Sequence, residues 1–333
     1  MIISQTPLRV SFFGGGTDFE GYYIKHGGLV LSATINKYIY LIINPRPDNN
    51  IVLNYSKREI VQDVNQIEHN IFREVLKFTQ ITKSIEITSI SDITSEGSGL
   101  GSSSAFIVGL LNAIYTYKGI TKKPHELAEL ACKIEIDILG SPIGKQDQYA
   151  VAFGGLRKYH FNKDGSVLVN KIDFSAEHYK RFKNNTLLFN TGITRKVSPI
   201  LSVQKANIEV NFNHLNMLKE IAIIGENYLT NLDFKNTGNL LNTSWEKKKL
   251  LSNKINNDEI NRIYELGKKA GVFGGKLLGA GGGGFFLFLC PPEKQNNLRT
   301  LLKDYQELHF EFEKHGSSII YNNMGTQTQL KNA

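Results

Sequence analysis

The sequence predicts an α+β fold rich in antiparallel strands, and three observations along the chain indicate it. Short β-type segments alternate with helical segments over the first half of the 333 residues. Residues 199–270 then have almost entirely helical patterns, and β-type segments return from residue 274. A regular winding of βαβ units would alternate strands and helices to the end, so this order favours an α+β architecture.

Four β-type segments and one helix are predicted before residue 92. QTPLRVSFF (5–13) is a strand that ends at GGGTD, and GLVLSATINKYIYLIINPRP (28–47) forms either two paired strands or one long bent strand. IVLNYS (51–56) and SIEITSIS (84–91) are further strands, rich in β-branched residues. VNQIEHNIFREVLKF (64–78) lies between them and has the apolar spacing of an amphipathic helix.

The middle of the chain contains two predicted helices followed by strands. Ser103–Tyr117 carries an apolar stripe at helical spacing, and PHELAELACKIEIDIL (124–139) is opened by Pro124, whose missing N–H costs nothing at that position. LRKYHF, SVLVNKIDF and NTLLFNTG bring back β structure between Leu156 and Gly192.

The C-terminal region is predicted to contain strands in GGKLLGAGGGGFFLFLC, a short helix near KQNNLRTLLKDY and two closing strands in LHFEFEKHGSSIIYN. The composition shifts near residues 184–200, and no repeat or flexible linker is evident. We therefore expect two domains, residues 1–190 and 191–333.

The composition is that of a soluble globular enzyme, with 41% hydrophobic and 21% charged residues. Cys132 and Cys290 lie in apolar segments and are expected to be buried thiols, and no Cys/His spacing suggests zinc. No apolar run approaches the roughly 20 residues of a membrane span, and the N-terminus lacks a basic and an apolar leader region, so we expect a cytoplasmic protein without a membrane partner. The net charge of +8 is scattered; its one short cluster, WEKKKL (245–250), favours a solvated helix face over a nucleic-acid patch.

The stretch SEGSGLGSSSAFIVGLLNAIY (95–115) has the chemistry of an anion site. Alternating glycines let the backbone approach a phosphate, and the helix that follows points free N–H groups at it. Hydroxyls on the first turn can cap the helix or supply an oxygen to Mg²⁺. The residues concerned are Gly97, Gly99, Gly101, Ser102, Ser103 and Ser104.

A magnesium site needs a carboxylate as well as a hydroxyl. Glu135 and Asp137 lie in the second predicted helix, and Asp147 begins a further helical piece after a Gly/Pro turn. Taken alone, Glu135 also fits a solvent-facing position on a helix. Asp147 also fits an acidic residue in the first turn of a helix.

GAGGGG (279–284) formally matches a dinucleotide fingerprint, but the match fails on context. A bulky strand follows it, whereas that fingerprint opens a helix. The protein-kinase interpretation also fails, because about fifty residues remain downstream and the chain contains no H-R-D or D-F-G. The glycines therefore form a strand–loop–strand turn that packs closely against another element or a ligand.

Together, three motifs resemble those of the GHMP small-molecule kinases in order and spacing. They are PLRVSFFGGGTDF (7–19), GSGLGSSSA (97–105) and GGKLLGAGGGGFF (274–286), and the resemblance extends over about residues 3–322. It implies the GHMP kinase fold, with an N-terminal ribosomal-S5-like α/β part and a C-terminal ferredoxin-like α+β part. It also implies ATP and Mg²⁺ as cofactors, a small-molecule substrate, and a monomer or homodimer.

The resemblance implies roles for individual residues. Asp147, in GKQDQ, matches the aspartate that accepts the proton of the substrate hydroxyl, and Arg9 matches the basic residue that pairs with it. Ser103 and Glu135 match the Mg²⁺ ligands. The loop around the ATP phosphates comprises Gly97, Ser98, Gly99, Leu100, Gly101, Ser102, Ser103 and Ser104. Residues implied to contact the sugar are Gly16, Thr17, Asp18, Gly281 and Gly282.

Within the superfamily, FGGGTDFEGYY with GGLVLSATINKYIYL is most similar to the D-glycero-D-manno-heptose 7-phosphate kinases, although Glu20 stands where that branch often has Pro. Galactokinases carry Gly-Glu-His-Thr-Asp where this chain has GGGTD (14–18), so two polar groups of a galactose pocket are missing. The resemblance thus implies a kinase that phosphorylates the anomeric hydroxyl of D-glycero-α-D-manno-heptose 7-phosphate.

A phosphorylated substrate needs a cationic receptor, and NTGITRKVSPIL (190–201) is the candidate. Arg195 offers a two-pronged guanidinium on a strand-to-helix loop. The alternative is an ordinary exposed Arg-Lys pair.

Three other functions stay open at the level of sequence. An unphosphorylated hexose such as fucose or galactose would suit the same motifs. A catalytically silent sugar- and nucleotide-binding regulator is disfavoured because Arg9, Glu135 and Asp147 are all present. A nucleic-acid-binding protein would need a clustered basic patch that the sequence lacks.

Overall fold

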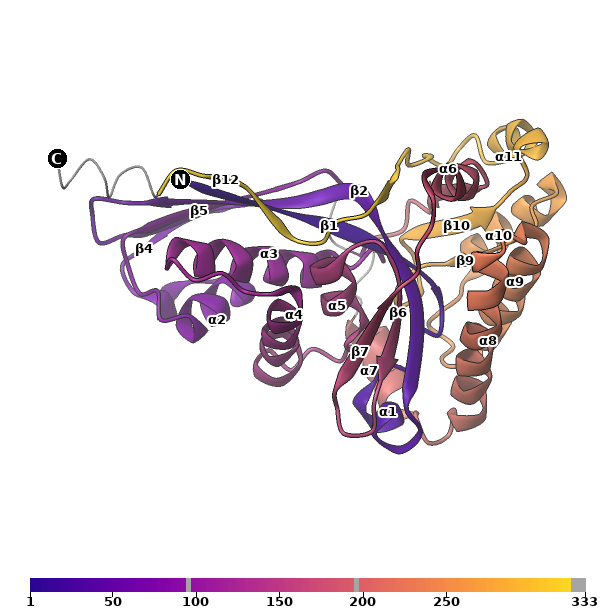
Figure 1. The fold of residues 1–333 in the computed structure, drawn as a ribbon, viewed down its shortest axis with the longest axis horizontal. Coiled ribbons are helices and arrows are strands. Elements are labelled where there is room, and N and C mark those ends of the chain that lie inside the picture. Colours follow the sequence, from indigo (N-terminus) through magenta and orange to yellow (C-terminus); the bar gives the residue numbers. More distant parts are fainter. Residues whose placement is uncertain (94–96, 195–197, 325–333) are drawn as a thin grey trace.

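A single long strand, β2 (Gly28–Pro45), is the axis of the fold in the computed structural model, which describes residues 1–93, 97–194 and 198–324. It pairs along most of its length with β1 (Ile2–Phe13). On its other side, the first residues of β2 pair with β6 (Leu156–Phe161) and its last residues with β5 (Ile85–Ser91). The segment is therefore one bent strand, because two different partners occupy its two halves (Figure 1).

Within the described residues the first sheet has nine strands and runs in the order β12-β1-β2-β5-β3-β4, with β6 and β11 paired to β2 and β7 paired to β6. Its pairs are antiparallel except for β3 with β5, in agreement with the predicted architecture. The remaining strands are β3 (Ile51–Asn54), β4 (Arg58–Val61), β7 (Val167–Lys171), β11 (Phe312–Glu313) and β12 (Ser318–Asn322).

Four helices cover one face of the long part of this sheet (Figure 1). They are α2 (Asn70–Phe78), α3 (Ser102–Tyr117), α4 (Pro124–Cys132) and α5 (Gln146–Phe153). The central one, α3, packs against β1, β2, α4 and α5, and eleven of its sixteen residues are buried. This burial fixes the glycine-rich loop before α3 against the sheet. The short helix α1 (Glu20–His26) follows the loop after β1.

Two expected helices are divided in the structure. A 3₁₀ turn (Val64–Gln66) precedes α2, because Glu59 accepts the backbone N–H groups of Glu68 and His69 that a continuous helix would use. The second expected helix changes after α4 into a π-helical segment, Lys133–Ile138. Two helices were not anticipated: α1 (Glu20–His26), and α6 (Ala176–Asn184), which is capped by Ser175 and stands before β8.

A second, three-stranded sheet has the order β8-β10-β9, formed by Thr186–Asn190, Phe285–Leu289 and Gly274–Leu277. The predicted helical region accompanies it as α7 (Ser198–Ala206), α8 (Phe212–Thr230), α9 (Phe234–Lys249) and α10 (Asp258–Ala270), and α11 (Gln295–Leu301) follows. Trp245, Phe286 and Phe288 are at the centre of its hydrophobic core, which is separate from the core beneath the first sheet.

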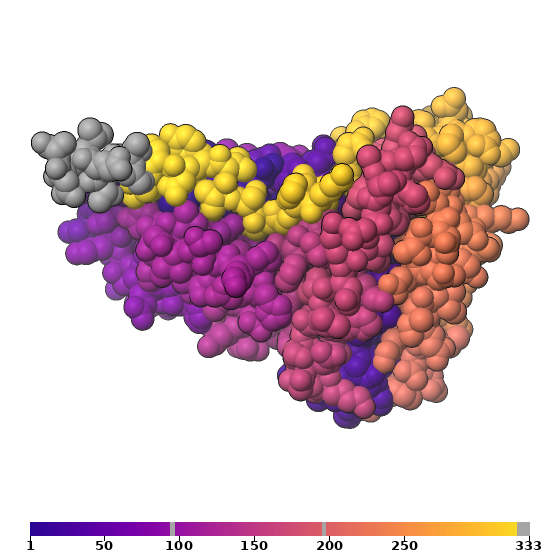
Figure 2. All heavy atoms as spheres, viewed as in Figure 1, coloured from indigo at the N-terminus to yellow at the C-terminus, as the bar shows by residue number. Residues whose placement is uncertain are grey.

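After α11 the chain returns to the first sheet. β11 pairs with β2 and β12 pairs with β1, so residues from the two ends of the sequence lie side by side across the upper edge of the molecule (Figure 2). Cys132 and Cys290 are buried free thiols, as predicted. Among the described residues, no helix is long and apolar enough to cross a membrane.

The second and third glycine loops touch backbone to backbone. Gly99 and Gly279 both have positive φ, +75° and +67°. A Cβ on Gly279 would lie 2.5 Å from the Cα of Gly99, and one on Gly99 would lie 2.7 Å from the carbonyl oxygen of Leu278. Only glycine fits both positions. This contact holds the loop before α3 beside the loop between β9 and β10.

We predict that Gly279→Ala destabilises the protein by at least twice as much as Gly119→Ala. Gly119 has a similar φ of +74° but has no atom within 4 Å of an added Cβ, so its variant reports the left-handed backbone alone, about 1 kcal/mol. The difference in unfolding free energy, from denaturant titration, then isolates the contact between the loops. Equal losses for the two variants would show that the loops do not touch.

Candidate active site

A cleft of about 670 Å³ lies where the two sheets and the three glycine-containing loops meet. It is lined by the loop after β1, the loop before α3, the π-helical segment, the start of α5, and residues of α7, α9 and β9. Its floor and walls carry most of the polar side chains that the sequence analysis singled out. Those that line the cleft are Arg9, Gly16, Asp18, Gly97, Ser98, Gly99, Gly101, Ser102, Ser103, Glu135 and Asp147.

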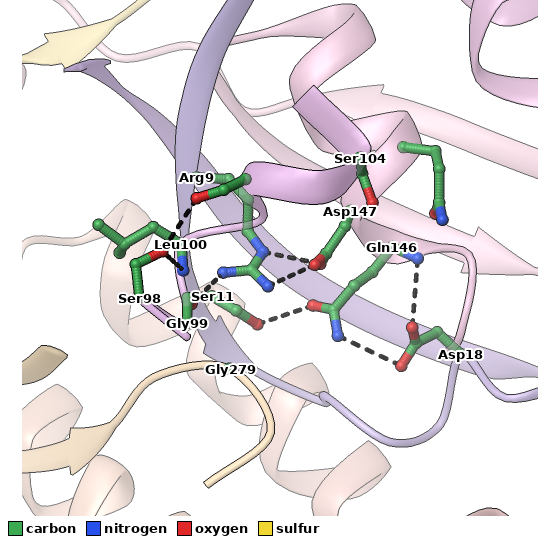
Figure 3. A network of polar contacts seen from close by, with 12 residues as sticks. Arg9, Ser11, Asp18, Ser98, Gly99, Leu100, Ser104, Gln146, Asp147 and Gly279 are labelled. Atoms are coloured by element: carbon green, nitrogen blue, oxygen red, sulfur yellow. Dashed lines mark hydrogen bonds and ion pairs between the residues drawn. The ribbon is translucent and has the colours of Figure 1, made fainter. Parts of the chain in front are cut away.

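Arg9 and Asp147 form a two-pronged ion pair in the middle of the cleft (Figure 3). Nε and Nη2 of Arg9 donate to Oδ1 and Oδ2 of Asp147 at 2.7 and 2.6 Å. The third prong, Nη1, donates to the carbonyl oxygen of Gly99 at 2.6 Å. Arg9 is 3% exposed and Asp147 is 21% exposed, so the carboxylate is reachable from the cleft while the guanidinium holding it is buried. Asp147 also lies in the first turn of α5, where the helix dipole favours a negative charge.

The loop before α3 leaves the helix N-terminus open to the cleft. α3 starts after Gly101, and within the described residues no side chain caps it. The hydroxyl of Ser98 instead bonds Ser102 at 2.9 Å and accepts the N–H of Leu100, so the first-turn N–H groups keep their capacity to bind an anion. Leu100 itself is buried and its carbonyl accepts the N–H of Arg9 at 2.9 Å. The loop is thereby fixed to β1.

Glu135 lies in the π-helical segment and is almost completely buried, at 3% exposure. Its Oε2 accepts the hydroxyl of Ser104 and the side-chain amide of Gln148, both at 2.7 Å. Burial raises the pKa of the Glu135 carboxyl, and these hydrogen bonds together with one from Ser103 oppose that rise. The extra residue per turn of a π segment turns this carboxylate toward α3 and α5, which is a geometry often found at functional sites.

Asp18 is 2% exposed and organises the loop after β1. It accepts the N–H of Gly16 at 2.9 Å and the N–H of Gln146 at 3.2 Å, and Gln146 in turn accepts the hydroxyl of Ser11 (Figure 3). Burial raises the pKa of the Asp18 carboxyl, the nearby charge of Asp147 raises it further, and the N–H donors lower it. Asp18 therefore connects the loop after β1 to the start of α5.

Not every residue named from the sequence reaches the cleft. Thr17 is fully buried, and its hydroxyl donates to the carbonyls of Gly14 and Leu29. Of the third loop, Gly279 and Ala280 line the cleft, whereas Gly282 donates its N–H to Ile255 and packs away from it together with Gly281. Ser104 and Leu100 lie behind the residues that line the cleft. Arg195 lies outside the described residues.

Comparison with known proteins decides the family. Residues 65–155 match the GHMP kinases N terminal domain, and residues 227–305 match the GHMP kinases C terminal domain. A D-glycero-alpha-D-manno-heptose 7-phosphate kinase from Campylobacter jejuni is 35% identical over 331 residues, covering 95% of this chain and 97% of that protein. The chain belongs to the GHMP kinases.

Solved structures agree with this assignment. A D-glycero-D-manno-heptose 1-phosphate kinase from Bacteroides thetaiotaomicron has a TM-score of 0.80 and 26% identity, covering 97% of this chain and all of the other. A putative sugar kinase from Campylobacter jejuni has a TM-score of 0.75 and 32% identity, covering 96% and 97% of the two chains. The GHMP kinase fold expected from the three motifs is confirmed.

Several residues that line the cleft of this GHMP kinase were not predicted from the sequence. Lys248 belongs to the WEKKKL cluster, which was predicted to be a solvated helix face, but it is buried at 8% exposure and lines the cleft. The prediction is wrong at this position because α9 turns the middle lysine inward. Lys276 is a single charged residue in an apolar strand, a signal that could have been used. Gln146 gave no sequence signal beyond its place beside Asp147.

The cleft is also lined by His69, Asn70, Ile71 and Phe106, with the rings of His69 and Phe106 stacked at 5.4 Å. These residues come from α2, its N-cap and α3, and carry no motif. Their position was set by the packing of α2 against α3, which the sequence did not specify.

We predict that Glu135→Gln raises the thermal unfolding midpoint at pH 7.5. The pKa of Glu135 is raised above its ordinary value of 4.5 by burial, so its ionised form is disfavoured in the folded protein and costs stability above pH 4.5. As the pH falls through that window the wild-type carboxyl becomes protonated and the gain of the variant should disappear. Asp137→Asn, two residues along and exposed, is the control and should show no such pH-dependent gain. A variant less stable than wild type at pH 7.5 would contradict this.

Proposed function

We propose that the protein is an ATP-dependent sugar kinase that transfers a phosphoryl group to the anomeric hydroxyl of D-glycero-α-D-manno-heptose 7-phosphate, with the 1,7-bisphosphate and ADP as products. Membership of the GHMP kinases supports the reaction type, and the 35% identical relative, a heptose 7-phosphate kinase, supports the acceptor. The alternative acceptor is an unphosphorylated hexose such as fucose.

The observation that carries the proposal is the Arg9–Asp147 pair facing the cleft. Phosphoryl transfer needs positioning and charge neutralisation, and a group to accept the proton of the attacking hydroxyl. Each oxygen of Asp147 has two acceptor positions, and Arg9 takes one on each. One position per oxygen is left for the substrate hydroxyl. The carboxylate cannot rotate away, because both of its oxygens are held.

The remaining roles follow from position in the cleft. The first-turn N–H groups of α3 and the loop from Gly97 to Ser104 would bind the phosphates of ATP. Asp18 and the backbone of Gly16 belong to the loop after β1, which is bonded to the start of α5 next to Asp147, and the acceptor sugar would bind there through its hydroxyls. The lining residues around Phe106 would contact the base.

The oxygen ligands at this place fit Mg²⁺. Ser103 is exposed in the first turn of α3, and Glu135 presents a carboxylate with Oε2 already bonded, so Oε1 is the oxygen left to face a cation. Among the described residues no cluster of three or more His, Cys, Asp or Glu could hold a metal ion. A cation held by one carboxylate and one hydroxyl, with substrate phosphates and water completing its shell, matches the preference of Mg²⁺. Bound there, it would neutralise charge on the ATP phosphates.

The test is an ATP-consumption assay with a panel of acceptors: heptose 7-phosphate, unphosphorylated heptose, fucose, galactose and mevalonate. We expect kcat/KM for heptose 7-phosphate to exceed that of every other acceptor by tenfold or more, and the reaction to stop when EDTA removes Mg²⁺. A ³¹P spectrum of the product should show a new phosphate ester at the anomeric carbon. Preference for fucose, or turnover unaffected by EDTA, would contradict the proposal.

A further inference from the structure

Two buried lysines line the cleft without an assigned role: Lys248 lies outside the three motifs, and Lys276 lies in the third, GGKLLGAGGGGFF (274–286). Lys276 projects from β9 and is 4% exposed, and Lys248 projects from α9 and is 8% exposed. Both line the cleft, together with Ser244 of α9 and Gln204 of α7. Fully buried lysines are rare unless they are paired.

Lys276 has little compensation for its charge. Its Nζ donates to the backbone carbonyl of Phe12 at 2.8 Å, and this is its one hydrogen bond to the described residues. An ammonium group has three donors, so two N–H groups remain for a ligand. No carboxylate of the described residues lies within ion-pair distance of Nζ.

The surroundings add positive charge. Burial lowers the pKa of Lys276 well below its ordinary value, and the charges of Lys248 and Arg9 lower it further. The charge of Arg9 is already matched by Asp147. Lys248 donates to the carbonyl of Gly279. Lys276 is thus a buried cationic group that no carboxylate of the described residues matches, and a bound anion would offset its cost.

Position indicates which anion. Phe12, whose carbonyl accepts from Lys276, leads directly into the loop with Gly16 and Asp18, to which the acceptor sugar is proposed to bind. The lining residues around Phe106, proposed to contact the base, belong to α2, its N-cap and α3, whereas Lys248 and Lys276 belong to the second sheet and its helices. Gly279, the partner of Lys248, borders the network around Arg9 and Asp147 (Figure 3).

We propose that Lys248 and Lys276 form the subsite for the phosphate group that the acceptor sugar carries. The inference deepens the proposed function and rests on it. In this proposal the two lysines determine the specificity for a phosphorylated acceptor. Two ammonium groups in a water-excluded site bind a phosphate dianion, and an unphosphorylated sugar lacks that contact.

The first test compares Lys248→Met and Lys276→Met with wild type on heptose 7-phosphate and on unphosphorylated heptose. We expect the ratio of the two kcat/KM values to fall tenfold or more, equivalent to about 1.4 kcal/mol, while KM for ATP stays within about twofold. Lys247→Met is the matched control, since Lys247 precedes Lys248 on the same helix and does not line the cleft. An unchanged ratio, or an equal rise in KM for ATP, would overturn the assignment.

The second test needs no turnover, and it shows whether the lysines bind a phosphate group of ATP or that of the acceptor. Binding of inorganic phosphate is measured by calorimetry with the protein saturated by Mg²⁺ and a non-hydrolysable ATP analogue. We expect wild type and Lys247→Met to bind phosphate and Lys276→Met to bind it at least tenfold more weakly. If wild type saturated with the analogue does not bind phosphate, or if Lys276→Met binds phosphate as well as wild type does, the lysines do not hold the acceptor phosphate.

The acceptor panel and these two tests distinguish failure of the phosphate subsite from failure of the proposed function. If the acceptor panel fails while phosphate still binds beside the ATP analogue and depends on Lys276, the choice of heptose is wrong and the phosphate subsite stands. If heptose 7-phosphate is the preferred acceptor and the lysine variants leave the specificity ratio unchanged, the subsite is wrong and the proposed function stands. Methionine matches lysine in length, and a thermal midpoint no lower than that of wild type shows that each variant is folded.

Discussion

The site depends on one buried guanidinium. Arg9 joins three parts of the chain that are far apart in sequence: its own strand β1, the loop before α3 through Gly99, and the start of α5 through Asp147. Because a guanidinium is planar and always charged, its three bonds fix the angle as well as the distance between these parts. Asp147 therefore keeps its position only while all three parts stay in place.

The charges around this pair are arranged in two groups. Asp18 and Glu135 are buried near Asp147, and the pKa values of both are raised by their burial and by its charge. Lys248 and Lys276 also line the cleft. Both groups are costly in the protein alone, because buried like charges repel one another. The magnesium ion and the acceptor phosphate that we propose would offset both costs.

The sequence was most informative where backbone geometry restricts the residue type. The three glycine loops could be found because close backbone contacts such as Gly99 with Gly279 exclude other residues, whereas the roles expected for Arg9, Asp147 and Glu135 came from the resemblance to the GHMP kinases. Side chains positioned by tertiary packing left no such signal. Lys248 looked like its exposed neighbours in WEKKKL, and the π segment that turns Glu135 inward is indistinguishable in sequence from an ordinary helix. The inward rotation of α9 depends on the second core, which no local pattern encodes.

A double-mutant cycle on Arg9 and Asp147 tests the central claim most directly. The kcat of Arg9→Met, Asp147→Asn and the double variant is measured with saturating ATP and acceptor. If the two residues act as one unit, Asp147→Asn lowers kcat by roughly 10²–10⁴-fold, and adding Arg9→Met lowers it little further. Independent effects, in which the losses of the two single variants multiply in the double variant, would contradict the account.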